Sequence, residues 1–237
     1  METPYAENTV YATLRTYDTV IFRLDDHVDR LLESARLIHL HHPFTFDDLK
    51  SECLAAVDSI HFDPVRLRIV LSDQELNVEV EPLSEKPDEY YRNGVAGIFY
   101  EGIRHDPDAK RHQQMVCANA KQAAVDSGAF EAVLVDENGM IGECAYANLF
   151  WVKNGQLYTV ESGVLPGITR RTVLEIADDC QFDRISKEEL LKADELFYYP
   201  NHQWHSAYGH LGFSKNWRWQ ARAGYERFDG TVWGLCG

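Results

Sequence analysis

Two stretches of the sequence, Gly142-Glu-Cys-Ala-Tyr-Ala-Asn-Leu-Phe150 and Leu165-Pro-Gly-Ile-Thr-Arg170, decide the fold. The first places Glu143 shortly after the Asn138-Gly139 turn signal and just before a strand-like apolar run. The second leads from a Pro-Gly turn into a helix start, where backbone N–H groups bind phosphate readily. Most glutamates after such turns are solvated, and most Gly turns of this kind are ordinary helix caps. It is the pair of stretches together that indicates a binding site.

A lysine precedes these stretches. Lys110 lies 33 residues before Glu143, at the end of the polar segment Glu101–Lys110, which contains Gly102 and Pro107 and is the best candidate for an interdomain linker. Most such lysines are solvated surface groups, so the position alone decides little. Lys121 is the nearest competitor, and we expect it to be exposed on a helix spanning Met115–Asp126.

The spacing of Lys110, Glu143 and the Gly-Ile-Thr turn resembles that of the fold-type IV (class IV) aminotransferases. This family contains branched-chain aminotransferase, D-amino acid transaminase and aminodeoxychorismate lyase, and the similarity extends over roughly Val10 to Phe197. It implies a two-domain α/β fold, with a small N-terminal α/β domain over residues 1–102, a linker over 103–109, and a larger β-barrel-like domain over 110–237. It also implies a homodimer in which the partner's loops complete the substrate pocket.

The resemblance further implies pyridoxal 5'-phosphate as the cofactor, together with a role for each matched residue. Lys110 would bond to the cofactor's aldehyde, and Glu143 would hold the pyridine nitrogen protonated so that the ring accepts electrons. The remaining cofactor-binding residues are Leu165 against one ring face, Ile168 and Thr169 on the phosphate, Arg30 as the phosphate-binding arginine, and Asn201 as the second phosphate contact. Without the family, Arg30 would be taken as a surface charge opposite an apolar stripe.

Apolar periodicity and turn signals predict the remaining elements. Strands are expected at Val10–Arg15, Val20–Arg23, Val65–Leu71, Leu76–Val80, Gly94–Tyr100, Glu131–Val135, Leu149–Val152, Leu157–Val160 and Glu195–Tyr199. Helices are expected from Val28 to Ile38 and over Pro43–Ser59, Met115–Asp126, Thr169–Cys180 and Glu188–Lys192. After about residue 200 periodicity disappears.

Composition excludes several classes of protein. The formal net charge of −15 argues against a nucleic-acid partner, which requires clustered Lys and Arg. The five cysteines are scattered without CxxC spacing, and none of the ten histidines shows metal-ligand spacing, so we expect neither a metal site nor a disulfide framework. No leader opens the chain and no apolar run approaches ~18 residues, so a cytoplasmic protein without a membrane partner is expected.

The chain departs from the family at three places. It begins later than family members usually do, and Met115 stands where branched-chain enzymes have a tyrosine. From about Tyr199 the sequence is anomalous: Tyr199-Pro-Asn-His-Gln-Trp-His205 replaces a small-residue segment, although Asn201 could still make its contact. Reading the back-translated codons one base forward permits a family-like sequence, so we take a frameshift as one hypothesis for the tail.

These observations predict transfer of an amino group between an amino acid, branched-chain-like or similar, and a 2-oxo acid. Three alternatives stay open. The chain could be an aminodeoxychorismate lyase that releases 4-aminobenzoate and pyruvate, a member impaired by a damaged C-terminus, or a binding module that keeps the fold without the chemistry.

Overall fold

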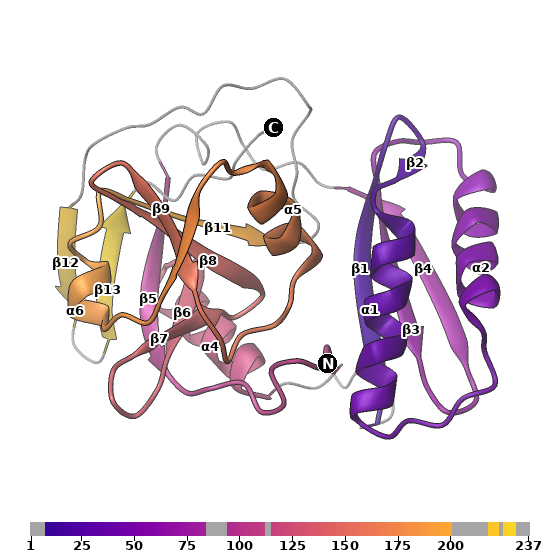
Figure 1. The fold of residues 1–237 in the computed structure, drawn as a ribbon, viewed down its shortest axis with the longest axis horizontal. Coiled ribbons are helices and arrows are strands. Elements are labelled where there is room, and N and C mark those ends of the chain that lie inside the picture. The colour runs from indigo at the N-terminus through magenta and orange to yellow at the C-terminus, as the bar shows by residue number, and fades with distance from the viewer. Residues whose placement is uncertain (1–7, 84–93, 112–114, 201–217, 223–224, 231–237) are drawn as a thin grey trace. The chain divides into compact units, whose positions relative to one another are not determined.

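The structure is a computed structural model that describes residues 8–83, 94–111, 115–200, 218–222 and 225–230 (Figure 1). The chain forms two compact units. Among the described residues, unit 1 contains 8–83 and 106–111, and unit 2 contains 94–105 and everything from 115 onward. Each unit has a hydrophobic core of its own.

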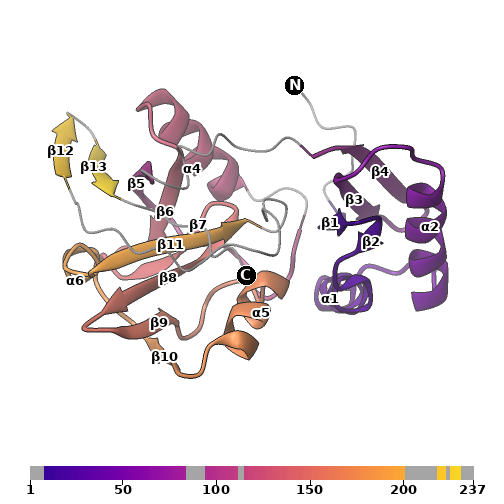
Figure 2. The same ribbon diagram turned by 90° about the horizontal axis from the view of Figure 1, so that it is seen from above.

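Unit 1 is an antiparallel sheet covered on one face by two helices (Figures 1 and 2). The elements are β1 (Val10–Tyr17), β2 (Val20–Ile21), α1 (Leu24–Leu37), α2 (Phe46–Asp58), β3 (Val65–Leu71) and β4 (Leu76–Pro82), and the strand order is β2-β1-β3-β4. Alternation along the strands explains the arrangement, because Ala12, Leu14 and Leu67 point to the same face and are fully buried against α1 and α2. Helix α2 begins at Phe46 because Thr45 and Asp48 form a capping box.

Unit 2 contains two sheets. Its elements are β5 (Val95–Glu101), α4 (Met115–Asp126), β6 (Glu131–Val135), β7 (Ile141–Cys144), β8 (Ala147–Lys153), β9 (Gln156–Val160), α5 (Ile168–Ile176), β10 (Cys180–Asp183), α6 (Lys187–Leu190), β11 (Glu195–Pro200), β12 (Arg218–Arg222) and β13 (Tyr225–Gly230). The strand orders are β10-β9-β8-β11 and β12-β13-β5-β6-β7. Strands β5 and β6 are parallel, and α4, which lies between them in sequence, packs on both.

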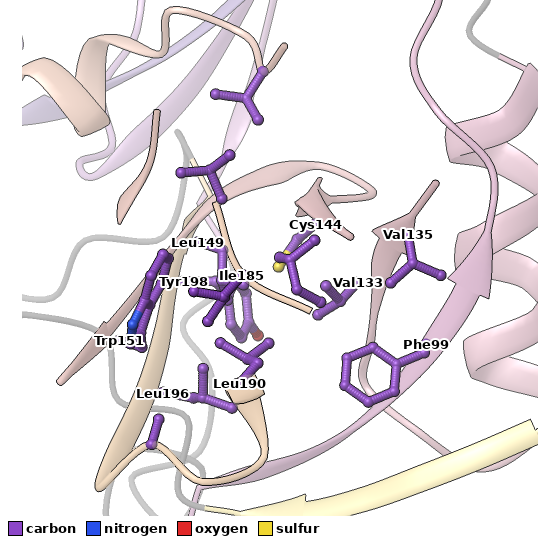
Figure 3. Close-up of a cluster of buried hydrophobic side chains, with 14 of the residues drawn as sticks. Phe99, Val133, Val135, Cys144, Leu149, Trp151, Ile185, Leu190, Leu196 and Tyr198 are labelled. Atoms are coloured by element: carbon purple, nitrogen blue, oxygen red, sulfur yellow. The ribbon is translucent and has the colours of Figure 1, made fainter. Parts of the chain in front are cut away.

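The main core of unit 2 lies between these sheets. In Figure 3 the side chains of Val133 and Cys144, from one sheet, face those of Leu149 and Tyr198, from the other. Because neighbouring residues of a strand point to opposite faces, the inward direction of Cys144 turns Glu143 to the other side of β7. The side chain that the sequence marks as functional is therefore kept out of the apolar core.

The mixture of helices and sheets confirms the expected α/β class, and most predicted elements appear within two or three residues of their expected bounds. One expectation was wrong. The helix expected over Thr169–Cys180 ends at Ile176, because Ala177 is extended and Cys180 begins β10, which pairs in parallel with β9. For β12 and β13, which lie after residue 200, there was no prediction; they pair with each other, and β13 also pairs with β5.

In the described part of the chain, no helix is both long enough and apolar enough to cross a membrane.

Candidate functional site

Glu143 is the centre of a buried polar network in unit 2. Its carboxylate is 3% exposed, and its Oε1 accepts hydrogen bonds from Nε of Arg104 at 2.7 Å and from the backbone N–H of Leu165 at 3.2 Å. A buried carboxylate is tolerated only when it is paired and hydrogen-bonded, and Arg104, itself 8% exposed, supplies both. The guanidinium therefore keeps a negative charge at Glu143 in the interior.

Asn148 holds the turn that follows. Its side-chain amide donates from Nδ2 to the carbonyl of Leu165 at 2.8 Å, so both backbone groups of Leu165 are fixed, the N–H by Glu143 and the C=O by Asn148. Oδ1 of Asn148 lies 2.1 Å from the place where a Cβ on Gly167 would stand. The glycine is required here by this close approach, since its φ of −66° and ψ of 139° suit other residues as well.

Helix α5 begins directly after this turn. Gly167 is its N-cap and provides no side-chain cap, while Ile168 and Thr169 form the first helical positions and are both 3% exposed. The first N–H groups of any helix have no partner within the helix, and the helix dipole adds a partial positive charge at that end. A glycine N-cap in a buried turn therefore leaves a cradle suited to an anion.

In unit 1 the structure brings Lys110 and Arg30 to the same serine. The backbone N–H of Lys110 donates to Oγ of Ser34 at 3.1 Å, and that hydroxyl donates to the carbonyl of Arg30 at 2.8 Å. Arg30 is 8% exposed and Lys110 is 7% exposed, so neither is a solvated surface charge. The Lys110 ammonium lies 5.0 Å from the ring centroid of Tyr11, whose N–H donates to the Lys110 carbonyl.

The predicted site residues thus form two groups. Arg30 and Lys110 meet in unit 1, and Glu143, Leu165, Ile168 and Thr169 meet in unit 2. Asn201, the expected second phosphate contact, lies outside the described residues.

Comparison with known proteins gives the family. The model of the family described as amino-transferase class IV matches residues 9–199, most of the chain. The chain belongs to the class IV aminotransferases.

Two relatives show the spread of this family. The D-alanine aminotransferase of Bacillus licheniformis is 29% identical over 209 residues, covering 79% of this chain and 73% of the relative. A probable branched-chain-amino-acid aminotransferase of Rickettsia conorii is 31% identical over 211 residues, covering 79% and 70%.

Two solved structures resemble this aminotransferase over most of its length. A putative 4-amino-4-deoxychorismate lyase has a TM-score of 0.76 at 26% identity, covering 85% of this chain and 86% of that one. A branched-chain amino acid aminotransferase complexed with N-(5'-phosphopyridoxyl)-L-glutamate has a TM-score of 0.71 at 28% identity, covering 82% and 73%. Pyridoxal 5'-phosphate is the cofactor of the family.

The residues of this aminotransferase fit such a cofactor. A pyridinium needs a buried carboxylate that remains ionised, which Arg104 secures for Glu143. A phosphate needs backbone donors at a tight turn, and the Gly167 cradle ahead of α5 offers them. An aldehyde needs an amine held away from bulk water, and Lys110 is buried.

Three supporting residues escaped the sequence analysis: Ser34, Arg104 and Asn148. Each acts on a partner distant in sequence, up to 76 residues away for Ser34 and Lys110. The only local signal was the position of Arg104 and Asn148 inside the segments already singled out.

Lys121 was expected to be exposed, and that expectation was wrong. Its side chain is 32% exposed, and its ammonium donates to the carbonyl of Phe130 and lies 3.5 Å from Oε2 of the buried Glu131. Burial raises the pKa of the Glu131 carboxyl, and the Lys121 charge opposes that shift. Lys121 is thus a structural lysine that connects α4 to the start of β6. The turn between α4 and β6 is short, so the long Lys121 side chain lies over the ring of Phe130.

Proposed function

We propose that this class IV aminotransferase moves an amino group between an amino acid, branched-chain-like or similar, and a 2-oxo acid. The observation that carries the proposal is the Arg104–Glu143–Leu165 network, which joins a buried ionised carboxylate to the anion cradle of Gly167. That arrangement suits a ligand with a cationic ring nitrogen and a phosphate. The chemistry that pyridoxal phosphate supplies when bound is an aldehyde that combines with amines and a ring that accepts electrons.

In this proposal Lys110 is the catalytic residue. Its Nζ would hold the cofactor's aldehyde between turnovers and, once displaced by the substrate amine, would carry the proton away from the substrate's α-carbon. The hydrogen bond from its N–H to Ser34 and that of its carbonyl with Tyr11 fix the backbone that carries the amine. A fixed backbone limits the movement of Nζ, which favours repeated proton transfer between the substrate's α-carbon and the cofactor.

The other residues would bind and orient. Glu143 would keep the ring nitrogen protonated, and Leu165, whose backbone the network fixes at both ends, would pack on one ring face. The phosphate would be held by Ile168 and Thr169 at the start of α5 and by Arg30, with Asn201 as the additional contact.

A lyase is the second candidate. The solved structure of a putative 4-amino-4-deoxychorismate lyase covers 85% of this chain, and this breadth supports elimination of pyruvate by the same residues as the alternative reaction. The two reactions share Lys110 and Glu143, so these two residues do not discriminate between them.

The experiment begins with purified protein and added pyridoxal phosphate. We expect a visible absorbance band in the wild type, its loss in Lys110→Ala, and its retention in Lys121→Ala, which removes the other lysine of the segment. Wild-type protein without a band, or turnover retained in Lys110→Ala, would contradict the proposal.

Substrate assays then separate the two reactions. Leucine and D-alanine are tested with 2-oxoglutarate, beside pyruvate release from aminodeoxychorismate. Amino transfer without pyruvate release supports the transaminase, and the reverse outcome supports the lyase.

We further propose a cytoplasmic homodimer. The four cysteines in the described part of the chain, Cys53, Cys117, Cys144 and Cys180, are free thiols, which supports a reducing compartment. Sedimentation of the purified protein tests the dimer, and a monomer at micromolar concentration would contradict it.

A further inference from the structure

The start of α5 lacks the features that usually stabilise a helix N-terminus. Gly167, its N-cap, offers no side-chain acceptor, and no acidic residue stands in the first turn. Arg170 and Arg171 occupy that turn instead, at the end of the helix where the dipole favours anions. The first bond within the helix runs from the Arg171 N–H to the Gly167 carbonyl, so the helical amides before Arg171 have no acceptor in the helix itself. Contacts outside the helix must therefore keep this turn in place.

Such contacts exist on both sides of the turn. Before the helix, the Asn148 side chain donates to the Leu165 carbonyl at 2.8 Å. Within the first turn, Nη2 of Arg170 donates to the carbonyl of Val160 at 2.7 Å. Val160 is the last residue of β9 and is 4% exposed, so it belongs to the core of unit 2. Arg170 thus connects the first turn of α5 to the end of a buried strand.

The Arg170 guanidinium is held between β9 and β10. It lies 5.5 Å from the ring centroid of Phe182 on β10, and in the part of the chain that the structure describes its Nε has no hydrogen-bond acceptor. Burial lowers the pKa of the guanidinium, while Cys180 and Glu143 oppose that shift. The pKa of arginine is so high that the group stays charged despite such a shift. A positive charge is therefore fixed beside the first turn.

Arg171, the next residue, is placed differently. Its side chain is 48% exposed and lies 3.7 Å from a carboxylate oxygen of Glu175, one helical turn further on. An exposed pair of this kind contributes little to stability. The two arginines carry the same charge in the same turn, but Arg170 is partly buried against β9 and Arg171 extends into solvent.

We propose that Arg170 is a positioning residue for the cofactor phosphate. The inference rests on the proposed function in taking the start of α5 as the phosphate site. The bond to Val160 keeps the N–H groups of the first turn aligned, and the fixed charge adds to the positive potential of the helix start. Because the guanidinium is bound to Val160 and lies over Phe182, it acts through the turn and not by touching the phosphate. Alone, a cation here opposes the helix dipole, whereas a bound dianion compensates both.

The test measures how much the phosphate adds to cofactor affinity. Pyridoxal 5'-phosphate and pyridoxal, which lacks the phosphate, are titrated separately into cofactor-free protein, and the ratio of their dissociation constants is compared among variants. Arg170→Gln loses a hydrogen bond from a charged donor, so binding of pyridoxal phosphate should weaken about 10- to 100-fold while binding of pyridoxal stays within about twofold. Arg170→Lys keeps the charge and should restore part of the affinity. The matched control Arg171→Gln removes the same charge from the next position and should leave the ratio near the wild-type value.

A second variant decides the case in which Arg170→Gln does not fold. Phe182→Ala removes the half-exposed ring over which the guanidinium lies and leaves α5 unchanged. It should weaken binding of pyridoxal phosphate about 2- to 5-fold, again without a change for pyridoxal.

An unchanged ratio in Arg170→Gln, or in Phe182→Ala where Arg170→Gln does not fold, would overturn the inference. Equal losses in Arg170→Gln and Arg171→Gln would overturn it as well, because they would assign the effect to charge alone. Wild-type protein that binds pyridoxal phosphate with this dependence on Arg170 but shows no turnover would count against the proposed function alone.

Discussion

Replacing Gly167 by alanine tests whether the Asn148 side chain holds the turn from Leu165 to Gly167. The backbone at Gly167 suits alanine, and in an open position the change would stabilise the fold by about 0.4–1 kcal/mol by restricting the unfolded chain. Here the new Cβ would stand 2.1 Å from Oδ1 of Asn148 and 3.3 Å from its Cγ, so Asn148 must move. This movement breaks the 2.8 Å hydrogen bond from Nδ2 of Asn148 to the Leu165 carbonyl and leaves the buried side-chain amide without an acceptor.

A buried amide without a hydrogen-bond partner lowers the free energy of unfolding by about 1–3 kcal/mol, which outweighs the stabilisation that alanine brings through the unfolded chain. We therefore expect Gly167→Ala to lower the free energy of unfolding by roughly 1–2 kcal/mol, equivalent to a fall in Tm of about 2–8 °C. Affinity for pyridoxal phosphate should also fall, since the turn that carries Ile168 and Thr169 would shift.

The assay is urea unfolding followed by tryptophan emission for four proteins: the wild type, Gly167→Ala, Asn148→Ala and the double variant. In the Asn148→Ala background there is no side chain to displace, so adding Gly167→Ala should cost nothing or stabilise slightly. This predicts a coupling energy of about 1 kcal/mol or more between the two positions. Equal costs of Gly167→Ala in both backgrounds would refute the reasoning.

The remaining predictions concern the buried charges and the tail. Arg104→Met should cost about 3–5 kcal/mol in urea unfolding because it leaves the Glu143 carboxylate buried without its partner, and the added change Glu143→Gln should recover part of it; a loss below about 1 kcal/mol would contradict this. The raised pKa of Glu131 means that the folded state binds the extra proton, so stability is lost as pH rises from the ordinary value of 4.5 through the raised one. Glu131→Gln should therefore gain stability over the wild type above that window and not below it, and a pH-independent difference would contradict the assignment. Independent DNA reads across codons 195–205 test the frameshift hypothesis, which an uninterrupted frame would exclude.

Local patterns predicted most elements because they depend on neighbours in sequence. The period-two alternation of β3 and the run Met115–Asp126 gave strand and helix bounds that the structure repeats. The same reasoning failed for the C-terminal end of α5, where pairing of β10 with β9 competes with helix continuation. It also failed for Lys121, whose surroundings depend on Phe130 and Glu131. In both cases a contact outside the segment outweighed the preference within it.

By itself, the sequence determined the family, the cofactor and the α/β class, because the Glu143 segment and the Leu165–Arg170 turn carry their chemistry in consecutive residues. Only the tertiary structure decided which other groups hydrogen-bond to the predicted site residues and hold them in place. Arg104 reaches Glu143 across 39 residues, Asn148 reaches Leu165 across 17, and Ser34 reaches Lys110 across 76. Such pairs are set by how strands and turns approach one another in space, and no local periodicity encodes that approach.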